Sequence, residues 1–234
     1  RMSGHSKWAT IKRKKGAQDA KRGTLFTKLA REIQIAAREG ADPDANFKLR
    51  LAVDKARANN MPKENIERAI NRGAGLEKGE ELLEATYEGY GPHGVAYLVQ
   101  VVTDNRNRAV SDIRRILTRM AESGAVAWQF EPKGYIAVAL DDHSPEEIFD
   151  WAIEAGADDV EIGEEQVEIY TAPDQLRWVR EALEARGLKI EAAERYMAPK
   201  TPLTLDGKEA LQNMHVIEQL EELDVLTRVY TNLD

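Results

Sequence analysis

The sequence predicts an α+β protein in which a small N-terminal helical bundle is followed by two ferredoxin-like α+β domains, the last inserted into the middle one. Up to Gly73, apolar residues recur at three- and four-residue spacing, which is typical of amphipathic helices. Beyond residue 84, short strand-like runs alternate with helical patterns. Between residues 135 and 196 these patterns follow the order β-α-β-β-α-β, which is that of the split βαβ fold.

Three helices are predicted in the basic N-terminal part. The first begins at Thr24, and Gly40 ends it. Its apolar stripe consists of Leu25, Phe26, Leu29, Ile33, Ala36 and Ala37. A second helix is predicted over residues 46–59, and Pro62 stands in the first turn of a third helix that Gly73 closes. The short connections between these amphipathic helices predict a small bundle.

A Glu-rich linker, 75–83, separates this bundle from a β-β-α-β segment. The segment is predicted to contain strands 85–90 and 95–103, a helix that Asn107 caps and that runs through Met120, and a strand 126–130. The ferredoxin-like unit follows, after a turn at 132–134. Its predicted elements are strand 135–140, helix 145–154, strands 159–162 and 166–170, helix 173–186 and strand 189–196.

The last two predicted elements, helix 207–222 and strand 225–231, have no partner in that completed unit. The segment 84–131 lacks just such a helix and strand. We therefore expect three domains: a basic helical domain 1–75, a discontinuous α+β domain 84–131 plus 203–234, and an inserted ferredoxin-like domain 133–200.

Composition indicates a globular protein. Of the 234 residues, 42% are hydrophobic and 32% are charged, and there is no cysteine. The most apolar stretch, 95–102, is interrupted by Gln100 and is far shorter than the ~20 residues of a membrane-spanning helix. No apolar segment typical of a secretory signal follows the basic start. We therefore expect a cytoplasmic protein without a membrane partner.

The net charge of −8 conceals two halves of opposite sign. Residues 1–73 contain 18 Lys and Arg against 8 Asp and Glu, a balance of +10, and the remaining 15 basic and 33 acidic residues give −18. Nucleic acids are attracted to the positive half and repelled by the negative one. This distribution predicts a protein that contacts phosphate with one face.

The basic half contains a run from Lys7 to Arg22 in which Trp8 offers a ring for base stacking. The alternative for this run is a solvated arm, with Trp8 packed on the bundle. Further cations extend over the helices, and two arginines follow the strand end at Thr103. The predicted nucleic-acid-binding residues are Lys7, Trp8, Lys12, Arg13, Lys14, Lys15, Lys21, Arg22, Lys28, Arg31, Arg50, Arg57, Lys63, Arg106 and Arg108.

No catalytic, metal or cofactor site is predicted. The four histidines are scattered without a paired ligand, and Gly73-Ala74-Gly75 lacks the third glycine of a dinucleotide fingerprint, so a helix end explains it better. Asp141-Asp142-His143 precedes Ser144-Pro145, where turn and cap chemistry accounts for it. The rival hypothesis from another class is a metal-dependent phosphoryl hydrolase that uses Asp104, Asp141 and Asp142. The tryptophans 128, 151 and 178 are expected in the core.

Several long motifs resemble the YebC/PmpR family. They are Met2-Ser-Gly-His-Ser-Lys-Trp-Ala-Thr-Ile-Lys12, Asp19-Ala-Lys-Arg22, Phe26-Thr-Lys-Leu-Ala-Arg-Glu-Ile33, Asn60-Met-Pro-Lys-Glu-Asn-Ile66, Tyr87-Glu-Gly-Tyr-Gly-Pro92 and Thr103-Asp-Asn-Arg-Asn-Arg108. The resemblance implies a three-domain α+β protein and a non-enzymatic regulator of gene expression. Members of that family are described as DNA-binding transcriptional regulators. Others, including the mitochondrial translational activator of cytochrome oxidase subunit one, act on ribosomes.

The chain departs from the family at Ala121-Glu-Ser-Gly-Ala125, where relatives usually carry a longer glycine-rich loop whose role here is open. We expect a translation factor that binds ribosomal RNA, because no helix with base-reading Asn, Gln and Arg stands out. The alternative is a regulator that binds duplex DNA with the same basic surface. A third reading is a protein-binding adaptor. The acidic domains are expected to meet protein or RNA partners, and the oligomeric state is left open.

Overall fold

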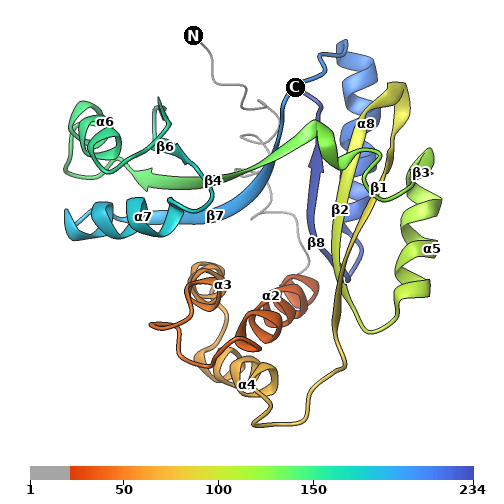
Figure 1. The fold of residues 1–234 in the computed structure, drawn as a ribbon, viewed down its shortest axis with the longest axis horizontal. Helices are drawn as coiled ribbons and strands as arrows, with labels where there is room; N and C mark the ends of the chain where they lie inside the picture. Colours follow the sequence, from red (N-terminus) through yellow and green to blue (C-terminus); the bar gives the residue numbers. More distant parts are fainter. Residues whose placement is uncertain (1–21) are drawn as a thin grey trace. The chain divides into compact units, whose positions relative to one another are not determined.

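The structure, a computed structural model, describes residues 22–234, which form two compact units (Figure 1). The smaller unit is Glu131–Ala198. The larger unit contains the described residues up to Phe130 together with Pro199–Asp234, so the smaller unit is inserted into it in sequence. The helices and the first sheet thus belong to one unit, and its division into a helical domain and a sheet domain stays a prediction.

The three predicted helices of the basic part are present. They are α2 (Arg22–Ala37), α3 (Phe47–Ala58) and α4 (Lys63–Gly73), which pack around Leu29, Ile33, Leu49 and Val53. Asn46 caps α3 by accepting a hydrogen bond from the Leu49 amide at 3.1 Å. Its side-chain amide donates to the Ala36 carbonyl at 2.8 Å, which connects the start of α3 to the end of α2.

Gly73 does more than end α4. A Cβ at this position would overlap the Gln34 carbonyl oxygen and lie 2.8 Å from the Ala37 Cβ, so glycine is needed because α4 approaches α2 closely. The left-handed backbone that often ends a helix occurs two residues later, at Gly75, with φ of 79°. The interpretation of Gly73 as a simple helix stop is therefore incomplete.

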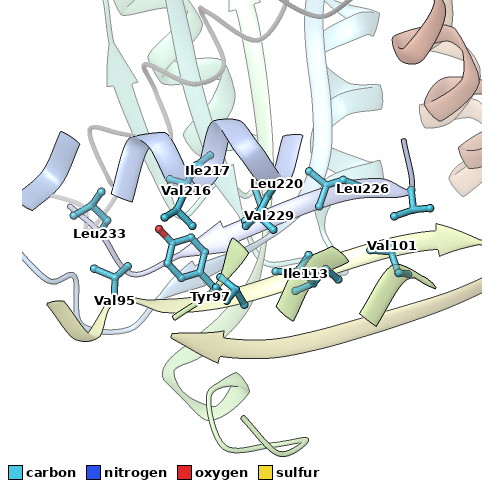
Figure 2. Close-up of a cluster of buried hydrophobic side chains, with 14 residues drawn as sticks. Val95, Tyr97, Val101, Ile113, Val216, Ile217, Leu220, Leu226, Val229 and Leu233 are labelled. Carbon is cyan, nitrogen blue, oxygen red and sulfur yellow. The ribbon is translucent and has the colours of Figure 1, made fainter. Parts of the chain in front are cut away.

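The larger unit contains a four-stranded antiparallel sheet of order β3-β1-β2-β8, which we call sheet A. Its elements are β1 (Leu83–Tyr90), β2 (Ala96–Thr103), α5 (Arg106–Ile116), β3 (Arg119–Ala121), α8 (Gly207–Glu221) and β8 (Leu226–Thr231). Alternate residues of β2, among them Tyr97 and Val101, face a core that Ile113 of α5 and Ile217 of α8 complete (Figure 2). Both helices therefore cover the same face of sheet A.

Two local predictions between residues 117 and 134 are wrong. The third strand is β3, within the stretch predicted as the end of a helix, whereas 126–130 contains a short 3₁₀ turn, Ala127–Gln129. The 132–134 turn is also absent, because β4 (Phe130–Ala139) runs straight through it. Local strand propensity at Val126 is overridden because its amide is bound by the Glu88 carboxylate at 2.9 Å.

The smaller unit has the predicted β-α-β-β-α-β order. After β4 come α6 (Pro145–Glu154), β5 (Asp159–Ile162), β6 (Gln166–Thr171), α7 (Leu176–Ala185) and β7 (Ile190–Pro199), and the strand order is β5-β6-β4-β7. Ser144 and Glu147 form a capping box at the start of α6, as the turn and cap interpretation predicted. The core prediction for tryptophans is wrong at two positions, since Trp128 is 67% exposed and Trp178 is 58% exposed.

Candidate nucleic-acid interface

Part of the predicted interface lies outside the described residues. This part comprises Lys7, Trp8, Lys12, Arg13, Lys14, Lys15 and Lys21. Arg22 begins α2, but its side chain is likewise outside what the structure describes. For these eight residues the binding role stays a prediction.

Three predicted binding residues make contacts inside the larger unit. The Arg31 guanidinium is buried and pairs with the Glu80 carboxylate at 3.3 Å. Arg50 donates to the backbone carbonyls of Pro43 and Asp44, at 3.1 and 3.0 Å. Lys28 donates to the Glu221 carbonyl of α8. Neighbouring segments therefore cover the surface on which we expected these three cations.

Glu32 of α2 lies between two cations. Its Oε1 is 2.7 Å from Arg228 Nη1 of β8 and 3.4 Å from Lys55 Nζ of α3. Burial raises the pKa of Glu32, but the attraction and hydrogen bonds of Arg228 and Lys55 outweigh it, so this pKa lies below its ordinary value of 4.5. The three charges connect the helices to sheet A.

The predicted linker continues this connection. Leu82 is buried against Ile35 of α2 and Val102 of β2. Arg38 at the end of α2 donates to the Leu82 carbonyl, and Lys48 lies 3.7 Å from the Glu84 carboxylate. The C-terminal end of the 75–83 segment is therefore packed between the helices and sheet A.

Exposed cations remain on α3 and α4. Arg57 pairs only loosely with Asp54, at 3.9 Å with 67% of its side chain exposed, and Lys63 lies 3.6 Å from Glu67 with 86% exposed. Arg68 and Arg72 are also exposed and have no ion pair with another described residue. Exposed pairs of this kind contribute about 0–1 kcal/mol, so a phosphate can compete with them.

A second group of cations lies on α5. Arg106 and Arg108 are exposed in its first turn. The predicted cap Asn107 is wrong, because Asn105 caps the helix and its Oδ1 accepts from the Arg108 amide at 3.1 Å. Arg114 and Arg115, which sequence reasoning missed, are exposed on the same helix. The signal for them was present, since an arginine pair directly follows the inward-facing Ile113 in an amphipathic pattern.

A buried carboxylate, that of Glu88, binds the segment 121–127, which includes the loop predicted to be shorter than in the family. Glu88 of β1 accepts from the amides of Gly124, Val126 and Ala127 at 2.5, 2.9 and 2.6 Å. Burial raises the pKa of Glu88, but these three hydrogen bonds outweigh that effect and lower it below 4.5. One side chain of sheet A thus binds three backbone amides of this segment.

Within residues 22–234 the structure shows no group of three or more His, Asp or Glu residues placed to hold a metal ion. Asp104 belongs to the larger unit, whereas Asp141 and Asp142 belong to the smaller one. The helices in the described part of the chain are also all too short or too polar to cross a membrane.

Comparison with known families gives two matches that together span nearly the whole chain. Residues 6–76 match the model for the TACO1/YebC protein N-terminal domain, and residues 82–233 match the model for the TACO1/YebC second and third domain. The second match alone covers more than half of the chain.

Comparison with individual proteins agrees with these matches. The chain is 51% identical to a probable transcriptional regulatory protein of Trichlorobacter lovleyi and 52% identical to one of Chloroflexus aurantiacus, in each case over 100% of this chain and 96% of the relative. Among solved structures it is similar to the conserved hypothetical protein Aq1575 of Aquifex aeolicus, with a TM-score of 0.83 and 45% identity over 92% of this chain and 91% of that one.

Proposed function

Because the chain belongs to the TACO1/YebC family, we propose that it is a nucleic-acid-binding regulator of gene expression whose positively charged N-terminal part holds the phosphate backbone. The observation that carries the proposal is the segregation of charge, +10 up to Gly73 and −18 beyond it. A chain polarised in this way attracts a polyanion to one part and repels it from the rest. The regulatory names of the relatives support the same class of function.

Within the described part of the bundle, the cations available to phosphate are the exposed ones on α3 and α4. Arg57 and Lys63 have weak, exposed partners, and Arg68 and Arg72 are exposed without an ion pair among the described residues. Lys28, Arg31 and Arg50 serve instead to hold the bundle together and to connect it to α8 and the linker. We therefore expect fewer phosphate contacts from these helices, and the 7–22 run, with seven Lys and Arg and one Asp, carries a net +6 of the +10 in this half.

Two targets fit this chemistry. Ribosomal RNA, for a role as translation activator, is the target that the Lys-rich run predicts, because irregular RNA is held mainly through its backbone and shape. Duplex DNA, for a role in transcription, is the target that the names of the relatives favour. Both readings use the same phosphate-binding surface.

The test is a binding titration at several salt concentrations, with ribosomes against duplex DNA. The intact chain is compared with a variant in which Lys12, Arg13, Lys14 and Lys15 are all changed to Glu. A matched control reverses four exposed cations outside the bundle, namely Lys189, Arg195, Lys200 and Lys208. Loss of about four phosphate contacts should flatten the log–log salt slope on duplex by roughly 3 to 4 units.

The tighter target at physiological salt decides between translation and transcription. The control should bind like the intact chain. If the control and the Lys12–Lys15 variant lose affinity equally, the loss reflects the change in net charge and not a contact made by Lys12–Lys15. If neither nucleic acid responds to the Lys12–Lys15 reversal, the proposal fails.

The regulatory names of the relatives also favour a role without catalysis. The rival phosphoryl hydrolase would need a divalent cation at Asp141 or Asp142. Tight Mg²⁺ or Mn²⁺ binding by the intact chain that disappears in Asp141→Asn would revive that hypothesis, and calorimetry measures it directly.

A further inference from the structure

Helix α5 covers one face of sheet A (Figure 1), and the side of the helix that is turned away from this core is polar and rich in arginine. Its inner side is defined by Ala109 and Ile113, both fully buried in the core of the larger unit. At helical spacing the opposite side consists of Asn107, Arg108, Ser111, Arg114 and Arg115, of which only Ser111 is partly buried. The buried side fixes the orientation of the exposed one.

This face is basic in the half of the chain that is otherwise acidic. From Asn105 to Arg119 there are five arginines and one acid, Asp112, whereas the residues beyond Gly73 together carry −18. A local concentration of one sign against a background of the other indicates a surface with an anionic partner.

The ion pairs of these arginines are weak. Arg115 lies 3.6 Å from Asp112 with 76% of its side chain exposed, and Arg108 lies 3.9 Å from Asp224 with both side chains more than half exposed. Arg106 and Arg114 make no ion pair with any described residue. Since exposed ion pairs contribute little to stability, folding gains little from these charges.

Two of the arginines even oppose helix formation. Arg106 and Arg108 stand in the first turn of α5, which contains no acidic residue, and cations there are disfavoured by the helix dipole. The turn is nevertheless well fixed, because Asn105 caps it and the Asn105 amide donates to Thr103 Oγ1 at 3.0 Å. A phosphate bound at this end would relieve the electrostatic cost.

We propose that α5 is a second nucleic-acid contact, which lies in the major groove of B-form duplex DNA. Arg108, Arg114 and Arg115 reach the phosphates on the groove walls, and Asn107 faces the base edges. The 11 residues of α5 span roughly 16 Å, and a helix of about 10–12 Å diameter fits a groove ~12 Å wide. The deep, narrow major groove of A-form RNA excludes such a helix.

This inference rests on the proposed function and narrows its target to DNA. The sequence favoured ribosomal RNA because no helix with base-reading side chains was apparent. The exposed Asn107 and arginines of α5 are residue types that read or flank base edges. Their common face becomes visible only once Ala109 and Ile113 are known to point inward.

The experiment measures binding of the full chain to a 30-bp DNA duplex, the RNA duplex of the same sequence and ribosomes, each at several salt concentrations. The variant is Arg114→Glu/Arg115→Glu, and the matched control with the same charge change is Lys189→Glu/Arg195→Glu on the smaller unit. Circular dichroism melting confirms that both are folded. We expect the variant to flatten the DNA salt slope by about 2 units and to lower DNA affinity at least tenfold, with little effect on the RNA duplex.

The outcomes separate this inference from the proposed function. If the Lys12–Lys15 reversal abolishes DNA binding while the α5 variant binds like the control, the proposed function stands and the α5 inference is wrong. If the α5 variant and the control lose DNA affinity equally, the α5 inference is wrong as well. If the α5 variant loses RNA duplex or ribosome binding but keeps DNA binding, the helix contacts RNA and the assignment to DNA is overturned. An asparagine-specific effect, in which Asn107→Ala changes affinity for some DNA sequences and not others, would support groove insertion.

Discussion

Arg228 Nη1 of β8 lies 2.7 Å from Glu32 Oε1 of α2, although the two residues are 196 positions apart in the sequence. Lys55 Nζ of α3 approaches the same oxygen at 3.4 Å. A single carboxylate therefore connects two helices of the basic part to the last strand of sheet A. Together with the Lys28–Glu221 hydrogen bond and the buried Leu82, this connection joins the helices to sheet A within one compact unit.

Removal of the Glu32 charge should weaken the larger unit. Glu32→Gln keeps the shape of the side chain but removes the negative charge that lies between Arg228 and Lys55. We expect the free energy of unfolding to fall by about 1–3 kcal/mol, because hydrogen bonds to charged groups are the stronger ones. Urea denaturation measures it, with the exposed Glu64→Gln as control. A change below roughly 0.5 kcal/mol would mean that the triad is too well solvated to matter.

The same carboxylate predicts a pH dependence. Because Arg228 and Lys55 hold the pKa of Glu32 below 4.5 in the folded chain, its contribution is present above the unfolded pKa and is lost as pH falls through the folded pKa. The stability difference between the intact chain and Glu32→Gln should be constant from about pH 7 to 5 and shrink below about 4.5. Urea denaturation of both proteins across this range tests it, and a difference that grows on acidification contradicts it.

Glu88 predicts the behaviour of the 121–127 loop. Replacement by Gln removes the charge that three amides share, so we expect faster hydrogen exchange at Gly124, Val126 and Ala127. The expected loss of stability is about 1.5–3 kcal/mol, the range for hydrogen bonds to charged groups. Glu122→Gln, an exposed change in the same loop, should leave exchange unaltered. Protected amides in Glu88→Gln would show that packing alone holds the loop.

Gly73 should tolerate no side chain. In Gly73→Ala the new methyl group would overlap the Gln34 carbonyl and press on Ala37, which forces α4 away from α2. We expect a loss of about 1–3 kcal/mol, the usual cost of overpacking, by thermal or urea denaturation. Arg68→Ala on the exposed side of α4 is the control and should be close to neutral. If Gly73→Ala is neutral as well, the helices can separate without cost.

Local rules predicted those parts of the chain in which neighbours in sequence are also neighbours in space. The apolar stripe from Leu25 to Ala37 gave α2, and Ser144-Pro145 with Glu147 gave the capped start of α6. The β-α-β-β-α-β order correctly indicated the fold of the smaller unit. Periodicity and capping act within a few residues, so the sequence alone displays them.

The sequence was misleading where a residue far away in the sequence determines the local structure or covers a side chain. Residues 126–130 have strand propensity. In the folded chain, however, the Glu88 carboxylate accepts hydrogen bonds from the Val126 and Ala127 amides, so these amides do not pair with a neighbouring strand. Arg31 lies on the polar side of α2, but Glu80 and the linker cover it. Helical spacing tells which side of a helix avoids its own core, and it does not tell whether another segment lies on that side.

The sequence by itself determined the helices of the basic part, the order of elements in the smaller unit and the separation of charge between the two halves of the chain. Only the tertiary structure decided which cations are exposed to a ligand. Lys28, Arg31 and Arg50 make contacts within the larger unit. The exposed cations include Arg57, Lys63, Arg114 and Arg115. The physical reason is that charge and periodicity are properties of a segment. Exposure depends on every segment that packs against it.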